Sequence, residues 1–132
     1  YFSACQTDMY DYTFEDLTDP YAYSEDSWAD IGWADITVPS GENVNVGCVI
    51  VTASQICSDD WPDEVTLYLK SPAGTILQIW QGFADFGCTT DFHFTTNAFD
   101  GEPSQGQWIL YFEDYYGDGG GTCVGAKLYI GN

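Results

Sequence analysis

The feature that most constrains the fold of this chain is a period-two alternation of apolar and polar residues in short runs. Residues 65–70 read Val-Thr-Leu-Tyr-Leu-Lys, so every second side chain is aliphatic, which is typical of a β-strand with one buried face. Similar patterns predict strands over 44–52, 76–80, 91–96, 108–113 and 124–130. Turn signals separate these runs, and no sustained helical repeat follows residue 35. The sequence therefore predicts an all-β protein, an antiparallel jelly-roll-like β-sandwich of about eight strands.

The alternation also predicts which side chains of the last two strands face the core, because successive residues of a strand point to opposite faces. The residues expected to face inward are Trp108, Leu110 and Phe112, followed by Val124, Ala126, Leu128 and Ile130. Trp80 is expected in the core as well. His93 is expected on the face opposite Phe92 and Phe94.

The length of 132 residues suits one domain with an appendage. Residues 1–34 are expected to form an irregular arm and residues 35–132 the sandwich. The first 33 residues hold eight acidic residues and five of the ten tyrosines. Because tyrosine offers a large contact area at low entropic cost, we expect the arm to contact either its own domain or a neighbouring subunit. The arm residues expected to do so are Cys5, Tyr10, Tyr12, Tyr21 and Tyr23.

The charge balance excludes two classes of partner. The chain has 21 acidic residues and two basic residues, Lys70 and Lys127, for a formal net charge of −19. Binding to nucleic acid or to an anionic membrane depends on Lys and Arg. We therefore expect no nucleic acid and no anionic membrane among the partners, and a protein partner instead.

Five cysteines in so short a chain favour an oxidising compartment, because cytosolic thiols are kept reduced. Their spacing fits no zinc signature, so disulfides are expected, in a pairing that the spacing does not decide. Two bridges leave one cysteine over, and Cys5 is the expected one because it lies in the arm. The disulfide cysteines are then Cys48, Cys57, Cys88 and Cys123. A secreted or cell-surface protein is the expected localisation.

The residue types favour a protein that is not an enzyme. His93 is the one candidate for a histidine base, and no GxSxG nucleophile motif accompanies it. A pair of carboxylates could support glycoside cleavage, but 21 acidic residues supply pairs at some suitable separation in any fold. We therefore expect His93 to be a structural or exposed strand residue.

Acidic residues gather in three expected loops, at 59–64, 100–102 and 113–118. Calcium binds six to eight oxygens, and a divalent cation between clustered carboxylates relieves their mutual repulsion. None of the clusters has the spacing of an EF-hand. Two interpretations stay open: one or more of these loops bind Ca²⁺, or all of them are simply solvated.

Three motifs occur in an order that resembles a known family. SPAGT at 71–75 follows an expected strand, EPSQGQWIL at 102–110 leads a later one, and Asp114 with GDGG at 117–120 precedes the last. Together they resemble the P domain (P/Homo B) that follows the subtilisin-like domain in proprotein convertases and in many secreted bacterial proteases. The resemblance covers roughly residues 35–131.

This resemblance implies a jelly-roll sandwich that often binds calcium and is not itself catalytic. Such a domain either stabilises a neighbouring protease domain or serves as an interaction module. The metal ligands that the resemblance implies are Asp114, Asp118 and Glu102. Asp100, in the same loop as Glu102, and Asp60 and Asp63, in the first acidic cluster, are further candidates because of their places in these clusters.

Three functions remain open from the sequence. The aromatic arm favours a structural subunit, stabilised by calcium and disulfides, whose arm joins it to copies of itself or to another protein in a surface or filamentous assembly. An exposed sheet edge could accept an added strand for this purpose. The alternatives are an accessory domain of a secreted subtilisin-like or metalloprotease and a calcium-dependent carbohydrate-binding module.

Overall fold

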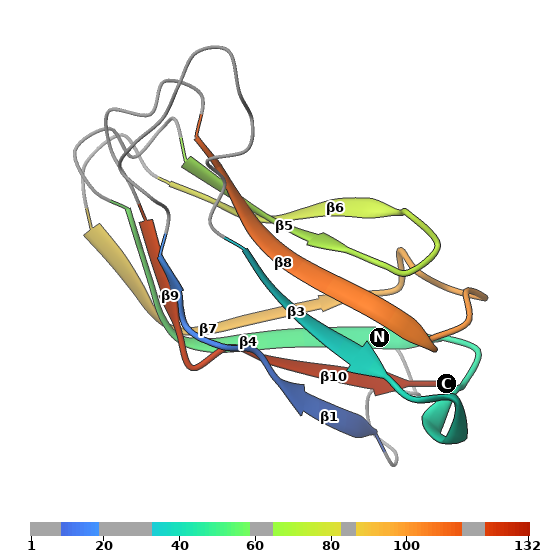
Figure 1. Cartoon of the computed structure of the whole chain (residues 1–132). Coiled ribbons are helices and arrows are strands. Elements are labelled where there is room, and N and C mark those ends of the chain that lie inside the picture. The colour runs from blue at the N-terminus through green and yellow to red at the C-terminus, as the bar shows by residue number, and fades with distance from the viewer. Residues whose placement is uncertain (1–8, 19–32, 59–64, 83–86, 115–120) are drawn as a thin grey trace.

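The predicted strands pair into two antiparallel sheets that face each other (Figure 1). The computed structural model describes residues 9–18, 33–58, 65–82, 87–114 and 121–132. Those residues form ten strands and one short 3₁₀ turn, and none of them lies in a helix long and apolar enough to cross a membrane. The strands are β1 (Tyr10–Thr13), β2 (Leu17–Thr18), β3 (Trp33–Val38), β4 (Cys48–Ser58), β5 (Val65–Lys70), β6 (Ile76–Gln81), β7 (Gly87–Thr96), β8 (Gly106–Asp114), β9 (Gly121–Val124) and β10 (Lys127–Gly131). The all-β antiparallel sandwich expected from the sequence is confirmed.

One sheet, sheet A, is built around the long strand β4. On one side β4 pairs with β7, and on the other with β10 and then β9. Strands β1 and β2 pair with β10 and β9 and complete that edge. The other sheet, sheet B, has the order β3-β8-β5-β6. All of these pairings are antiparallel, as a sandwich of hairpins and longer crossovers requires.

The core lies between the two sheets and follows the expected alternation in sheet B. Trp108, Leu110 and Phe112 of β8 are fully buried, so their prediction is confirmed. The Trp108 ring meets Phe99 edge to face at 5.1 Å, and its Nε1 donates a hydrogen bond of 2.9 Å to the Ser104 carbonyl oxygen. Full burial of each such side chain contributes about 1.5–3 kcal/mol.

Trp80 also lies in the core, as expected, and its Nε1 donates a hydrogen bond of 3.3 Å to Thr89 Oγ1. This bond satisfies the one polar atom of the indole, which a buried tryptophan needs. His93 is exposed and Phe92 and Phe94 are half-buried, so the expected faces of this strand are confirmed.

The alternation of buried and exposed residues is interrupted at the same level in all four lines of strands in sheet A, namely β1 with β2, β9 with β10, β4, and β7. We call this level the crease. There, two consecutive residues of each line are exposed, where alternation would bury one of them: residues 15–16, 124–125, 54–55 and 90–91. The pairing register is the same on both sides of the crease, because each of these lines of strands has one extra residue at that level. In Figure 1, β9 and β10 accordingly run in clearly different directions.

The crease corrects the prediction for the last strand. Ala126, Leu128 and Ile130 are buried, but Val124 is 38% exposed and Cys123 faces the core in its place. The cause is Gly125, whose φ of +68° lies in the left-handed region, and a Cβ there would lie 2.6 Å from Ser54 Oγ. Only glycine accommodates both constraints. Strict alternation therefore fails at this residue.

The described part of the expected arm belongs to the sandwich. Residues 10–13 and 17–18 are the edge strands β1 and β2 of sheet A, and Leu17 is 2% exposed. Between these strands, Phe14 is buried and its backbone N–H donates to the Ala126 carbonyl oxygen at 3.0 Å. Cys5, Tyr21 and Tyr23 lie outside the described residues.

The described cysteines divide between the two faces of sheet A. Cys57 and Cys88 are cross-strand partners and form a disulfide, and Cys48 is disulfide-bonded as well. Cys123, expected from the sequence to form a disulfide, is instead a free thiol in the core. Its cross-strand partner is Ile56, which faces inward, whereas Cys57 points the other way. The sheet therefore separates the Cys123 sulfur from the Cys57–Cys88 bridge.

We predict that Cys123 is unreactive until the protein unfolds. Its side chain is 1% exposed, and burial raises the pKa of its thiol to about 12, so almost no reactive thiolate exists near neutral pH. Alkylation followed by peptide mass spectrometry should label Cys123 only after denaturation without reductant, and a Cys123→Ala variant should lose that label. Rapid labelling in the native protein, or a Cys123 disulfide in the peptide map, would contradict this assignment.

Candidate functional site

Two of the sequence motifs meet at one end of the sandwich, around the carboxylate of Glu102. Ser71 Oγ donates a hydrogen bond of 2.6 Å to Glu102 Oε1, and Thr75 Oγ1 donates one of 2.8 Å to Oε2. The SPAGT turn thereby binds the loop that precedes β8. Ser71 is 1% exposed, so this polar contact is largely shielded from water.

Backbone hydrogen bonds fix the same loop to the segment before β4. Val46 N donates to the Glu102 carbonyl oxygen at 2.8 Å, and Gly101 N donates to that of Val46 at 2.7 Å. Ser104 N donates to the Val44 carbonyl oxygen at 2.9 Å, and Val44 N donates to Ser104 Oγ at 2.9 Å. We call Glu102, these partners, Ser71 and Thr75 the Glu102 clasp. It joins three segments that are distant in sequence.

The acidic residues expected to bind calcium do not gather in the described part of the chain. Glu102 faces two hydroxyl donors, and Asp100 is exposed. Asp114 ends β8, where its backbone is paired with Val65, while Asp60, Asp63 and Asp118 lie outside the described residues. Within the described ranges no three His, Cys, Asp or Glu side chains are grouped as metal ligands. Glu102 therefore accepts hydrogen bonds from two hydroxyl groups, a structural role that the sequence did not suggest.

We predict that Glu102 stabilises the fold independently of calcium. Glu102→Gln replaces a charge-assisted acceptor with a neutral amide, which should lower the free energy of unfolding by about 1–3 kcal/mol. The resulting fall in melting temperature should be the same with calcium as with EDTA. Asp100→Asn, an exposed neighbour, is the matched control and should change stability by less than about 0.5 kcal/mol. If EDTA abolished the difference between wild type and Glu102→Gln, Glu102 would be a cation ligand instead.

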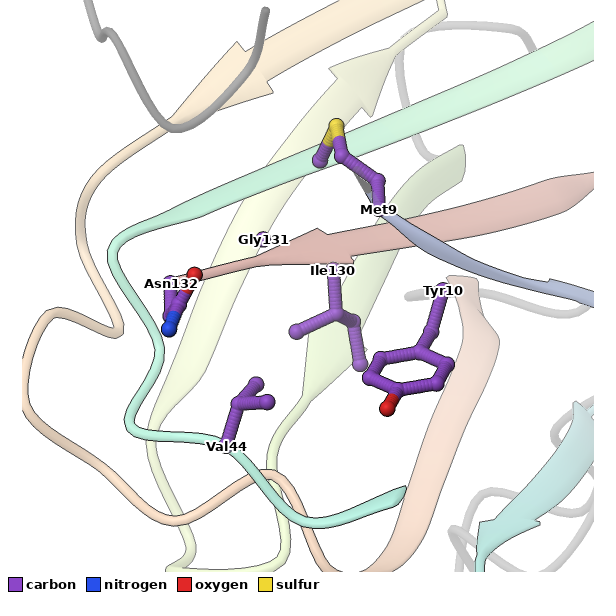
Figure 2. Close-up of a pocket in the computed structure, with 6 residues that line it drawn as sticks. All are labelled: Met9, Tyr10, Val44, Ile130, Gly131 and Asn132. Atoms are coloured by element: carbon purple, nitrogen blue, oxygen red, sulfur yellow. The ribbon is translucent and has the colours of Figure 1, made fainter. Parts of the chain in front are cut away.

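An apolar hollow of about 330 Å³ lies beside the edge strand β1. In Figure 2 the side chains of Tyr10, Ile130 and Val44 converge on it from β1, β10 and the segment before β4. Tyr10 is 41% exposed, and β1 pairs only with β10 among the described strands. The hollow therefore combines an apolar lining with an adjacent open strand edge, which is how an extended protein segment is bound by strand addition.

Tyr12 anchors this edge to the rest of the molecule. Its hydroxyl donates a hydrogen bond of 2.8 Å to Glu42 Oε1 in the 3₁₀ turn Ser40–Glu42. Burial, together with the Glu42 carboxylate, raises the pKa of Tyr12 well above its usual value of 10.0. The neutral phenol is thus favoured in the folded state, and its contribution to stability is complete below about pH 10 and declines above it. Of the arm tyrosines, Tyr10 lines the hollow and Tyr12 holds the strand.

A second, open groove of about 420 Å³ lies on the outer face of sheet A at the crease. It is lined by Ser54, Asp91, His93 and Lys127, among others. Asp91 has a φ of +51°, which costs an aspartate less than most other residues. No hydrogen bond joins Ser54, His93 and Asp91 to one another in the part of the chain that the structure describes. The groove thus lacks the bonded nucleophile and base that acyl transfer uses.

These features define a class of protein: a small disulfide-bonded β-sandwich whose signature loops close one end of the fold. The proprotein convertase P-domain family matches residues 49–128 of the sequence. The chain therefore belongs to the P-domain family, and the resemblance noted in the motifs is confirmed. The motif residues Ser71, Thr75 and Glu102 act in this fold as parts of the clasp.

Solved structures with a similar fold include parts of much larger proteins. A serine protease of Aeromonas sobria aligns with a TM-score of 0.58 at 17% identity, covering 96% of this chain and 28% of that chain. Dimeric latent PorU from Porphyromonas gingivalis aligns with a TM-score of 0.56 at 11% identity, covering 96% of this chain and 13% of that one. FlhE aligns with a TM-score of 0.58 at 9% identity, covering 92% of this chain and 91% of that chain. No curated protein sequence matches the chain. At these identities the likeness concerns the fold alone. The chain spans 28% of the serine protease and 13% of PorU.

Proposed function

We propose that this chain is a non-catalytic P-domain module that acts outside the cell by binding another protein. Membership of the P-domain family carries the proposal, and the Aeromonas sobria serine protease, in which a similar fold makes up about a quarter of the chain, supports it. The Cys57–Cys88 disulfide is in keeping with an oxidising, extracellular setting. On this proposal the module stabilises a protease or a comparable partner domain.

In this proposal the groove at the crease has no catalytic role. An activated nucleophile needs a base within hydrogen-bonding reach, and His93 has no such bond to Ser54 among the described residues. The proposal therefore assigns the module's effect to binding, by which a partner gains stability through mass action.

We predict that the purified chain raises the unfolding temperature of a secreted serine protease from the same organism, produced without a P domain of its own. The chain alone should hydrolyse no protein, ester or glycoside substrate. Stabilisation should fall when Glu102→Gln unfolds the module and return in conditions where that variant is folded. Hydrolysis by the chain that His93→Ala abolishes, or no stabilisation by the folded wild type, would contradict the proposal.

Self-association is the second candidate function, favoured by the open β1 edge and its hollow. Two copies, each with a net charge of −19, repel at low ionic strength. Self-assembly therefore needs salt or a divalent cation to offset the repulsion. This requirement makes a different, more basic protein the better-supported partner.

We predict a monomer at low ionic strength and, if the β1 edge mediates assembly, association when about 0.5 M salt screens the charges. Multi-angle light scattering measures both states. Tyr10→Asp should prevent the association by placing a charge at the hollow, whereas Asp91→Asn, on another strand, should not. A monomer under every condition would exclude self-assembly.

Calcium binding remains part of the proposal through Asp60, Asp63, Asp114 and Asp118, because clustered carboxylates are the ligands that Ca²⁺ prefers. The melting temperatures of the wild type with calcium and with EDTA, measured in the Glu102 experiment, decide the question. A bound ion should make the wild type melt at a higher temperature with calcium.

A further inference from the structure

The outer face of sheet B carries apolar side chains where a solvent-exposed sheet face is normally polar. In one cross-strand row, Trp33 of β3 lies opposite Tyr111 of β8, which lies opposite Tyr68 of β5. Trp33 is 59% exposed. Three aromatic residues from three adjacent strands therefore lie side by side on the outside of the sandwich.

The next row carries two isoleucines that alternate with charged residues toward the other edge of the sheet. Ile109 of β8 lies between Asp35 of β3 and Lys70 of β5, and Lys70 lies opposite Ile76 of β6. Ile76 is 53% exposed. We call Trp33, Tyr111, Tyr68, Ile109 and Ile76 the aromatic face. Exposed aromatic and aliphatic side chains that gather on one face mark interaction sites on soluble proteins.

The ring geometry favours a protein over a sugar as the ligand of this face. Tyr68 and Tyr111 stack on each other, with centroids 5.3 Å apart and planes 20° apart. Their facing ring surfaces are therefore already in contact, whereas a sugar-binding platform offers open ring faces. Tyrosine and tryptophan side chains presented in this way are typical of the central residues of protein interfaces.

The exposed charge beside Trp33 indicates which chemical group of a partner fits this face. Asp35 is exposed two residues from Trp33, on the same face of β3, at roughly 7 Å along the strand. Gln107 Nε2 donates a hydrogen bond of 2.5 Å to Asp35 Oδ2, which orients the carboxylate. A guanidinium group matches Trp33 and Asp35, because it can lie over the indole ring and bind the carboxylate at the same time. An ammonium group is more strongly hydrated and lacks the planar shape.

We infer that the aromatic face is a docking surface for a protein that presents an arginine to Trp33 and Asp35. The inference rests on the proposed function and adds to it the surface and the chemistry of the partner. Lys70 lies two strands away from Asp35 in the same row, so the basic side of the partner approaches over β3. The net charge of −19 supplies the long-range attraction for such a partner.

The test compares two peptides of equal charge, acetylated hexa-arginine amide and hexalysine amide, at about 0.15 M salt. The wild-type chain should bind the arginine peptide about two- to fivefold more tightly, as expected for one exposed cation–π contact. In ¹H–¹⁵N spectra, the Trp33 indole and residues of β3 and β8 should shift on binding.

Variants separate this contact from the general attraction between an acidic protein and a basic peptide. Trp33→Ala and Asp35→Asn should each bring the ratio of the two affinities close to one. Trp33→Leu, which keeps apolar area without an aromatic ring, should do the same, and each variant is first checked for folding by its melting temperature. Asp91→Asn removes the same charge from sheet A and should leave the ratio unchanged.

Three results would overturn the inference: a ratio near one in the wild type, a ratio that survives Trp33→Ala, or spectral shifts confined to other surfaces. A failure of this inference can be distinguished from a failure of the proposed function. If the wild type and Trp33→Ala stabilise the protease equally, the module binds protein through another surface. If the face selects arginine but the protease is never stabilised, the proposed function fails and the surface remains.

Discussion

The close approach of Gly125 to Ser54 is the constraint on which the arrangement of sheet A depends. No side chain fits at residue 125, where a Cβ would lie 2.6 Å from Ser54 Oγ, and the backbone there is left-handed. Gly125 N also donates to Asp16 Oδ1 at 3.0 Å, so a hydrogen bond joins two neighbouring segments within the crease. Because neighbouring lines of strands share the crease, their pairing register is preserved while the inward-facing set of residues changes.

This change of face decides the chemistry of the cysteines. Beyond the crease Cys123 faces the core, where burial raises the pKa of its thiol, while Cys57 and Cys88 meet across β4 and β7. A strand that alternated strictly would place Val124 inside and Cys123 outside. The free thiol and the disulfide therefore depend on the same bend in the sheet, although the three sulfur atoms belong to three strands.

The sequence predicts the fold well wherever a strand is regular. Trp108, Leu110 and Phe112 follow simple alternation because β8 has no crease, and each is fully buried. Val124 does not, because the bend depends on residues of several lines of strands that only the folded sheet brings together. The acidic cluster at 100–102 suggested a metal site, yet Glu102 binds the hydroxyl groups of Ser71 and Thr75. Those residues were visible as a motif, but their contact with Glu102 spans about 30 positions and has no local signature.

Trp33 shows the same limit for the aromatic face. In the sequence it is one aromatic residue at the end of an acidic, tyrosine-rich stretch, and no pattern connects it with Tyr111 or Tyr68. Pairing of β3 with β8 and of β8 with β5 creates the row. A surface assembled by strand pairing from residues 33, 68 and 111 cannot be recognised from local periodicity.

The proposed docking surface lies on sheet B, away from the irregular strand β7 of sheet A. Among the described strands β7 pairs only with β4, so it forms an edge of ten residues, long enough to invite pairing with another chain. Asp91 interrupts this edge with a charge and a φ of +51°. Charges and irregular backbone at an edge are devices that prevent unwanted strand addition. In sheet B the pairing of β5 with β6 shifts register between Leu67 and Tyr68, while β3 with β8 and β8 with β5 pair in unbroken register across the aromatic row. In the proposed interaction, long-range attraction by the acidic surface selects which proteins approach, and the aromatic row with Asp35 at its side determines which of them bind.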